Sequence, residues 1–98
     1  MQAKAKFYSA GAQGYFAKMV RHFSHKIPVT EGDGCVRLEF SCGLAELRVS
    51  EEILRMLITA GTPEQLVETC DVIERHLLRF AFREAPMPLE WQSLPKHD

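Results

Sequence analysis

The stretch Val36–Ser50, VRLEFSCGLAELRVS, is the most informative part of the sequence for the fold, because it holds two segments that alternate apolar and polar residues on either side of a short break. The apolar members are Val36, Leu38 and Phe40 before the break and Ala45, Leu47 and Val49 after it. Alternation is the pattern of a strand with one buried and one wet face, so the stretch predicts a β-hairpin. Opposite charges attract across neighbouring strands, which favours a register with Arg37 against Glu46. A second register that satisfies the same rule sets Glu39 against Arg48.

Three more strands are predicted outside this hairpin. Residues 3–8 alternate alanine and phenylalanine with lysine and tyrosine, and residues 53–59 form a more apolar run. Residues 87–91 alternate around Pro88, whose missing N–H confines a strand to the edge of a sheet. The EGDG segment at residues 31–34 is predicted as a turn. Strands that are half polar imply a mostly antiparallel sheet with one covered and one wet face.

Two amphipathic helices supply the cover for that sheet. Residues 12–25 carry an apolar stripe at helical spacing, and Pro28 ends the helix because it forces the residue before it out of the helical region. Residues 63–82 carry a second stripe, introduced by Thr62 as the N-cap and by Pro63 at the first helical position. The element order is therefore β-α-β-β-β-α-β. It predicts an α+β fold with two helices packed on one face of a mostly antiparallel sheet.

The composition describes one small domain. Its 98 residues predict a single ordered core over about residues 3–92, with a flexible tail at residues 93–98. A net charge of -1 provides no general positive field for phosphates, so we expect no nucleic-acid partner. No apolar run is long enough to cross a membrane and no signal-peptide pattern is present, so we expect no membrane partner and a cytoplasmic location. Three cysteines without a CxxC pair suit reduced thiols in that compartment.

Histidines and arginines are the residues from which a binding site can be built. His22 and His25 stand three residues apart near the end of the first helix, and residues at that spacing are neighbours on a helix surface. His76 shares a stripe of the second helix with Arg79 and Arg83, at the i, i+3, i+7 spacing. If the two helices pack side by side, the histidines of the first helix and this stripe of the second helix face the same groove. The predicted ligand-binding residues are His22, His25, His76, Arg79 and Arg83.

An anion is the ligand that such a groove favours. Arginine offers a bidentate fork to a carboxylate or phosphate, so we expect a small anionic ligand or a metal chelate. The position of Arg83 late in the helix favours a place in the groove, whereas Arg79, beside Phe80, is predicted to tie the helix to an internal carboxylate. No nucleophile triad, P-loop or dinucleotide motif is present. We therefore expect no catalytic residue and no cofactor, and a binding or accessory domain instead of an enzyme.

Three other interpretations stay open. The histidines of the first helix can be surface residues of its last turn, where the helix dipole stabilises a cation. His22, His25 and His76 can instead bind a metal ion, because imidazole suits zinc, copper or iron. Finally, the domain can be a structural or protein-interaction module without a small-molecule ligand, whose open sheet face forms a homodimer or meets another partner.

Three blocks of the sequence, within a span from about Ala5 to Gln92, resemble a bacterial family known only as domain of unknown function 2218. They are YFAKMVRHFSHKIPV at residues 15–29, CGLAELRVS at residues 42–50 and VIERHLLRFAFREAPMPLEWQ at residues 72–92. HFSHKIPV and RHLLRFAFRE are the most specific parts, while EEILRMLITAG departs from the Gly-Leu-His-Leu-like start of family members. The resemblance implies no activity. Through relatives fused to flavin-binding domains of the siderophore-interacting kind, it implies an association with iron, so that the chelate would be an iron–siderophore complex.

Overall fold

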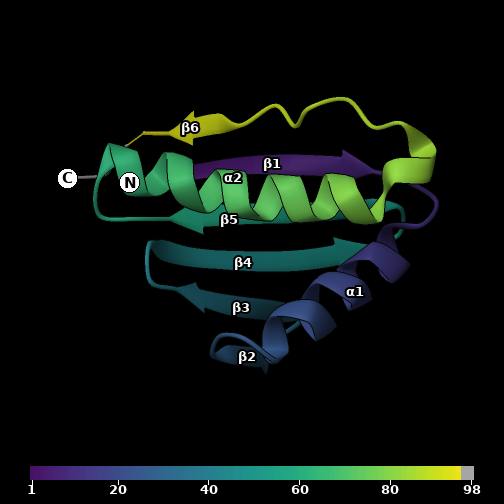
Figure 1. Cartoon of the computed structure of the whole chain (residues 1–98), viewed down its shortest axis with the longest axis horizontal. Coiled ribbons are helices and arrows are strands. Elements are labelled where there is room, and N and C mark those ends of the chain that lie inside the picture. The colour runs from purple at the N-terminus through teal and green to yellow at the C-terminus, as the bar shows by residue number, and fades with distance from the viewer. Residues whose placement is uncertain (96–98) are drawn as a thin grey trace.

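The computed structural model describes residues 1–95 and shows two helices on one face of a six-stranded sheet (Figure 1). The elements are β1 (Gln2–Tyr8), α1 (Ala12–Ser24), β2 (Val29–Gly32), β3 (Cys35–Phe40), β4 (Gly43–Ser50), β5 (Ile53–Thr59), α2 (Pro63–Phe80), the short 3-10 helix η1 (Phe82–Glu84) and β6 (Gln92–Leu94). The strand order is β2-β3-β4-β5-β1-β6, and every neighbouring pair is antiparallel. The predicted α+β fold, with both helices on the same sheet face, is confirmed.

The hairpin of β3 and β4 has one of the two registers that its charges predict. Arg37 lies opposite Glu46, and their side chains form an ion pair with 3.8 Å between Nε and Oε1. The start of α2 also follows its sequence, because the Thr62 hydroxyl accepts a hydrogen bond of 3.1 Å from the backbone N–H of Gln65. The charge pair of the hairpin and the N-cap of α2 are therefore both formed by the residues that the sequence predicts.

The core lies between the sheet and the two helices. α1 contacts strands β2 to β5, while α2 contacts β1, β4 and β5, so the helices meet above β4 and β5. Alternate strand residues point into this layer, including Leu38, Leu47 and Ile58, none of which is exposed to solvent. Phe40 and Val49, which the alternation predicts as buried, are half-buried near the ends of their strands. In the part of the chain that the structure describes, neither helix is long and apolar enough to span a membrane.

One strand, β2, lies in a segment where the sequence predicts a turn. The turn itself is confined to Asp33 and Gly34, which have positive φ values of 51° and 71°, as a tight two-residue hairpin requires. The residues before it pair with β3, where Val29 lies opposite Leu38 and Thr30 opposite Arg37. β2 escapes a pattern-based prediction because it is a short edge strand whose residues are mostly exposed, so it shows no alternation.

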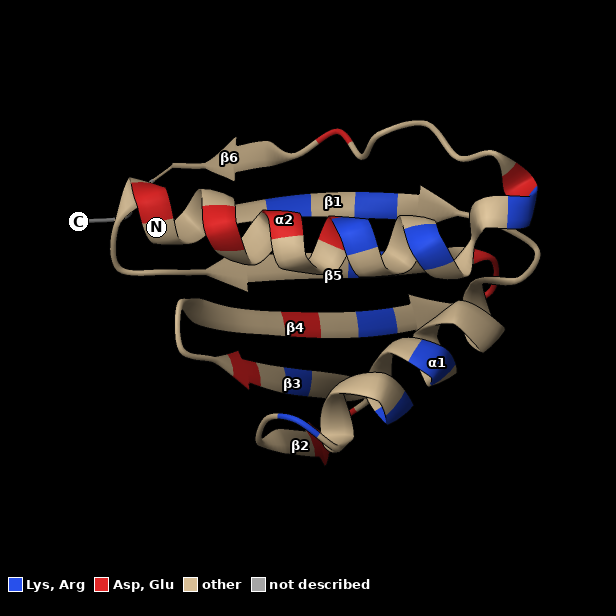
Figure 2. Cartoon of the chain, viewed as in Figure 1, with Lys and Arg blue, Asp and Glu red and all other residues tan. Residues whose placement is uncertain are grey.

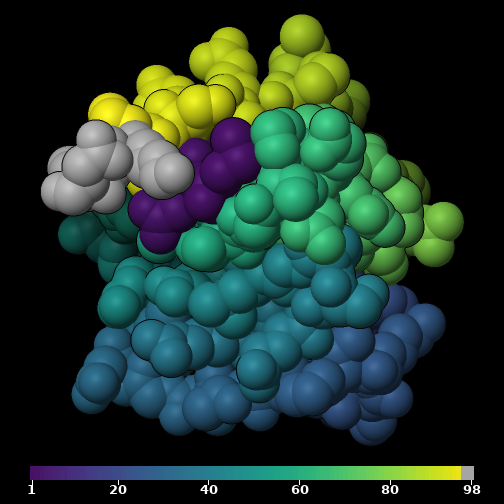
Figure 3. All heavy atoms as spheres, turned by 90° about the vertical axis from the view of Figure 1, so that its left-hand side faces the viewer, coloured from purple at the N-terminus to yellow at the C-terminus, as the bar shows by residue number. Residues whose placement is uncertain are grey.

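The last strand, β6, lies further along the chain than predicted. It begins at Gln92, whereas the alternation predicts a strand over residues 87–91, in which Pro88 cannot donate to a ladder. β6 pairs with β1 at the sheet edge, and Figure 3 shows the N-terminal residues between this strand and α2. Ser93 and Leu94 therefore belong to the sheet and not to a flexible tail. Residues 96–98 of the predicted tail lie outside the described residues.

Candidate functional site

The two helices meet at a pair of histidines. The imidazole rings of His22 on α1 and His76 on α2 lie with their centroids 4.9 Å apart and their planes tilted by 46°. Phe80 lies 5.8 Å from the ring of His22, and the buried Phe23 lies 4.8 Å from the ring of His76. Phe23 in turn contacts Phe40 of β3, with 5.1 Å between centroids. The two helix flanks therefore converge over a floor of aromatic rings.

The ring nitrogens of this pair have unequal partners. His76 Nδ1 lies 2.7 Å from the backbone carbonyl oxygen of Val72. A carbonyl can only accept, so Nδ1 carries the hydrogen and donates it, which leaves Nε2 of the neutral ring as an acceptor. His22 Nε2 is fully buried, and no group in residues 1–95 forms a hydrogen bond with it. A buried polar atom without a partner costs free energy, so this nitrogen marks a polar position that the fold itself leaves unsatisfied.

Positive charge gathers around His22. Burial lowers the pKa of His22 below the ordinary histidine value of 6.5, because desolvation disfavours the imidazolium. The charges that lower its pKa further belong to His76, Lys26, Arg79 and His25. Within residues 1–95, no acidic side chain shifts this pKa in the opposite direction. We refer to His22, His25, Lys26, His76 and Arg79 as the helix-junction cluster.

The arginines of α2 differ in their partners. Arg75 forms an ion pair with Asp71, with 2.8 Å between Nη1 and Oδ2. Arg79 is exposed, and no carboxylate within residues 1–95 forms an ion pair with it. The prediction that Arg79 ties the helix to an internal carboxylate is therefore wrong. The physical reason is its position, because its side of α2 faces solvent beside His22 and not the core.

Arg83 lies at the opposite end of α1 from the histidine pair. It belongs to η1, where its guanidinium carbon lies 5.6 Å from the centroid of the Phe82 ring. The neighbouring Glu84 accepts hydrogen bonds from Ser9, at 2.8 Å, and from Tyr15 in the first turn of α1. These bonds lower the pKa of Glu84, and the one from Tyr15 raises the pKa of that phenol. The structure therefore brings four predicted residues, His22, His25, His76 and Arg79, to one junction and leaves Arg83 elsewhere.

The geometry does not provide a three-histidine metal site. No group of three or more histidine, cysteine, aspartate or glutamate side chains within residues 1–95 is arranged to hold a metal ion. Lys26 and Arg79 would also repel a bare cation placed beside His22. The buried Cys70 is no substitute ligand, because burial raises the pKa of its thiol to about 11 and the thiol stays protonated. The cluster suits an anion better than a cation.

Lys26 is the member of the cluster that sequence reasoning leaves out. Its signal is present, since it follows His22 by four residues and closes the RHFSHK stretch. On α2, Figure 2 shows acidic residues along the first half of the helix, while both arginines lie together with Glu74 in the second half, which passes closest to α1. This separation of charge along α2 leaves the positive half beside the histidines.

The chain is similar in fold to a solved bacterial protein. It matches the NMR structure of PA4090 from Pseudomonas aeruginosa with a TM-score of 0.75, over 93% of this chain and 94% of that chain, at 21% sequence identity. No curated protein matches the sequence. The model of a family described as "uncharacterized protein conserved in bacteria", DUF2218, matches residues 4–92 and so covers nearly the whole domain, as the resemblance of its histidine and arginine blocks predicted. The chain therefore belongs to the bacterial family DUF2218.

Proposed function

We propose that the domain binds a small anionic ligand at the helix-junction cluster. The observation that carries this proposal is a group of cationic and protonatable side chains without an acidic counterpart in residues 1–95, which includes the unpartnered Nε2 of His22. Like charges held close together raise the free energy of the empty site. A carboxylate or phosphate placed among them would offset that cost, so an anion is the ligand class that the electrostatics favour.

Each side chain has a definite task in this proposal. Arg79 is exposed and unpaired within residues 1–95, so its planar fork is available for two parallel hydrogen bonds to a carboxylate or phosphate. His25 and Lys26 add long-range attraction at the C-terminal end of α1, where cations also interact favourably with the helix dipole. His76 is oriented by its bond to Val72, and its ring lies against that of His22, with 4.9 Å between the ring centroids.

Binding should be linked to proton uptake. His22 is neutral in the free protein at neutral pH, because burial and its cationic neighbours lower its pKa. A bound anion favours the imidazolium and raises that pKa, so the complex binds more protons than the free protein does. The affinity for an anion of constant charge should then increase as the pH falls toward the lowered pKa of His22 in the free protein.

Metal chelates with carboxylate surfaces belong to the same ligand class. A ferric citrate complex presents oxygen atoms and net negative charge to its surroundings, so it satisfies the same guanidinium fork. The family resemblance to domains associated with siderophore-interacting proteins is our reason for testing this version beside the free anion.

The test is isothermal titration calorimetry with citrate, phosphate and ferric citrate at constant ionic strength, at about pH 5.5 and about pH 7.5, on either side of the ordinary histidine pKa. Arg79→Gln should weaken citrate binding about tenfold or more, because a hydrogen bond to a charged group contributes roughly 1.5–3 kcal/mol. The matched control is Arg75→Gln on the same helix, which Asp71 already neutralises and which should change binding by less than about threefold.

Two results would overturn the proposal. One is the absence of binding by any of these anions at either pH. The other is an equal loss of affinity in Arg79→Gln and Arg75→Gln, which would mean that a general surface charge and not the cluster attracts the ligand. Tighter binding of ferric citrate than of citrate, lost in Arg79→Gln, would identify the chelate as the preferred ligand.

A further inference from the structure

A row of three cations crosses the sheet face opposite the helices. The register places Arg48 of β4 directly opposite Arg55 of β5, and Arg55 directly opposite Lys6 of β1. Partners in register point to the same side of a sheet. Successive residues of a strand point to opposite faces, and the chain neighbours Leu47 and Met56 are buried under the helices. The three cations therefore point to the open face of the sheet. We refer to Arg48, Arg55 and Lys6 as the cation row.

The row is not neutralised by its neighbours. Arg48 donates a hydrogen bond of 3.2 Å to the backbone carbonyl of Asp33, and Arg55 donates one of 2.9 Å to the Ser50 hydroxyl. Both acceptors are uncharged, and a guanidinium has five N–H groups, so most donors stay free. No carboxylate in residues 1–95 forms an ion pair with any member of the row. Like charges directly opposite each other destabilise a sheet, so the fold tolerates an unfavourable arrangement here.

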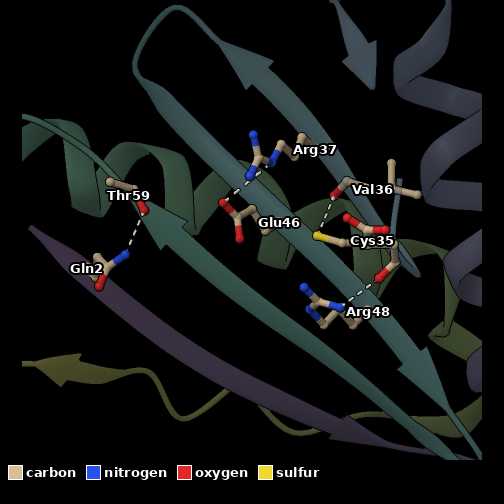
Figure 4. Close-up of polar contacts among 8 residues, drawn as sticks. Gln2, Cys35, Val36, Arg37, Glu46, Arg48 and Thr59 are labelled. Carbon is tan, nitrogen blue, oxygen red and sulfur yellow. Dashed lines mark hydrogen bonds and ion pairs between the residues drawn. The ribbon is translucent and has the colours of Figure 1, made fainter. Parts of the chain in front are cut away.

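The ion pair beside the row shows the contrast. Arg37 and Glu46 lie on the same open face, and their side chains form an ion pair with 3.8 Å between Nε and Oε1. Figure 4 looks at this face, with α2 behind the sheet, and shows Glu46 joined to Arg37 while Arg48 forms its hydrogen bond with a backbone carbonyl oxygen instead. Glu46, the acid that lines the same cavity as the row, is therefore engaged by Arg37, and no ion pair within residues 1–95 neutralises the row.

A shallow cavity of about 360 Å³ lies over the row. Its side-chain lining combines cations, one acid and two leucines: Lys4, Lys6, Arg48, Arg55, Glu46, Leu57 and Leu94. Two smaller cavities adjoin it: one of about 270 Å³ shares Glu46 and Arg48 and is also lined by Glu31 and Asp33, and one of about 260 Å³ shares Lys4 and Lys6 and is also lined by Glu90. The face thus offers concentrated positive charge next to exposed apolar surface, within a cavity in the size range of small-molecule sites.

We infer that the open sheet face binds an organic phosphate, with two or more phosphate groups on the cation row and an apolar ring or chain over Leu57 and Leu94. The row spans two strand spacings, about 10 Å, which suits a short chain of linked phosphates better than a single carboxylate. Arginine recognises phosphate oxygens through its fork, and lysine adds a mobile charge at the end of the row. The leucines offer no hydrogen bond, so they favour the apolar part of the same ligand.

This site is separate from the helix-junction cluster, because it lies on the other face of the sheet and shares no residue with that cluster. The probe is ATP, which joins a triphosphate to an aromatic base, measured by calorimetry without added metal at constant ionic strength. Tripolyphosphate carries the charge without the base, and adenosine carries the base without the charge. ATP should bind more tightly than tripolyphosphate, and adenosine should not bind.

The variant is Arg48→Gln/Arg55→Gln, which removes like charges and should therefore fold at least as well as the natural chain. It should weaken ATP binding about thirtyfold or more, which exceeds the effect of a single lost charge. Arg37→Gln is the control, because it removes one charge from the same face, a charge that Glu46 already pairs, and it should change affinity by less than about threefold.

Several outcomes would overturn this inference. ATP that does not bind at all, or adenosine that binds as well as ATP, would contradict it. A loss of binding free energy that is as large per removed charge in the control as in the double variant would mean that general surface charge, and not the cation row, attracts the ligand. Binding of ATP that survives in the double variant but is lost in Arg79→Gln would place the ligand between the helices, which would support the proposed function and remove the second site.

Discussion

The two faces of this sheet are built from the same strands but differ in the burial and the charge of their side chains. On the face under α1 and α2, side chains such as Leu38, Leu47 and Ile58 are fully buried, and opposite partners are apolar. On the open face, several direct partners are both charged: Arg37 and Glu46 attract each other, while the members of the cation row repel. The apolar contacts of the covered face stabilise the fold, so the open face can include the repulsions of the cation row even though they cost free energy.

The helix-junction cluster lies on the outer side of the covering layer, so it shares features of both faces. His22 and His76 rest on Phe23, which belongs to the core, while Arg79 is exposed. The Nε2 of His22 is therefore a buried polar atom without a hydrogen-bond partner in residues 1–95, at an otherwise apolar contact. The charges of the open face, by contrast, are exposed at Arg48 and Lys6 and half-buried at Arg55, so each of them costs less. The comparison predicts that substitutions will have effects whose size and sign depend on the face.

The largest effect is expected from a leucine on the covered face. Leu47→Ala should lower the free energy of unfolding by about 3 kcal/mol, because it opens a cavity under both helices at a site with no exposed surface. Leu57→Ala on the open face should cost about 1 kcal/mol or less, because Leu57 is half-buried and water fills the space. Urea denaturation of the two variants measures the difference directly.

An equal loss in the free energy of unfolding for Leu47→Ala and Leu57→Ala would contradict this difference between the two faces. It would mean that the open face is covered in solution, and the sheet-to-sheet homodimer considered from the sequence would be the first explanation. Size-exclusion chromatography at several protein concentrations would then show a dimer that Leu57→Ala weakens and Leu47→Ala does not.

A smaller effect of opposite sign is expected at the helix junction. His22→Phe should raise stability by about 1 kcal/mol, because it replaces a buried nitrogen that has no partner in residues 1–95 by an apolar ring of similar shape. The new ring would lie among Phe23, Phe80 and His76, which already surround His22. Thermal unfolding at neutral pH measures the gain. A loss of stability would show that His22 has a partner, such as an ordered water.

The same variant also changes the pH dependence of stability. The folded-state pKa of His22 lies below 6.5, so the unfolded chain takes up a proton first as the pH falls. Protonation of the unfolded state lowers stability as the pH decreases from about 7 through the lowered folded-state pKa, and this loss should be missing in His22→Phe. Urea denaturation across that range, compared with His25→Phe as an exposed control, isolates the contribution of His22.

Much of the fold follows from local patterns, and what escapes them has a physical reason. The register of the hairpin and the start of α2 depend on neighbours, Arg37 with Glu46 and Thr62 with Gln65, so the sequence predicts both. The convergence of the histidines depends on helix packing, so it stays conditional until the two helices are placed. The cation row depends on the strand order β4-β5-β1, which joins residues about fifty positions apart, and no local pattern contains that order.

The smallest effect is expected at the end of the cation row and tests whether the open face bears electrostatic strain. Lys6→Gln removes the charge opposite Arg55 and forfeits no ion pair within residues 1–95, so stability should rise by roughly 0.3 kcal/mol at low salt. Arg37→Gln breaks an attraction on the same face, so it should lower stability by a similar amount. Both differences should shrink in about 1 M salt, because exposed charges are screened there over about 3 Å. Urea denaturation of both variants at the two salt concentrations measures these changes in the free energy of unfolding, which should have opposite signs at low salt. If Lys6→Gln is destabilising at low salt, an acid already neutralises the row, and the free charge on which the organic phosphate depends does not exist.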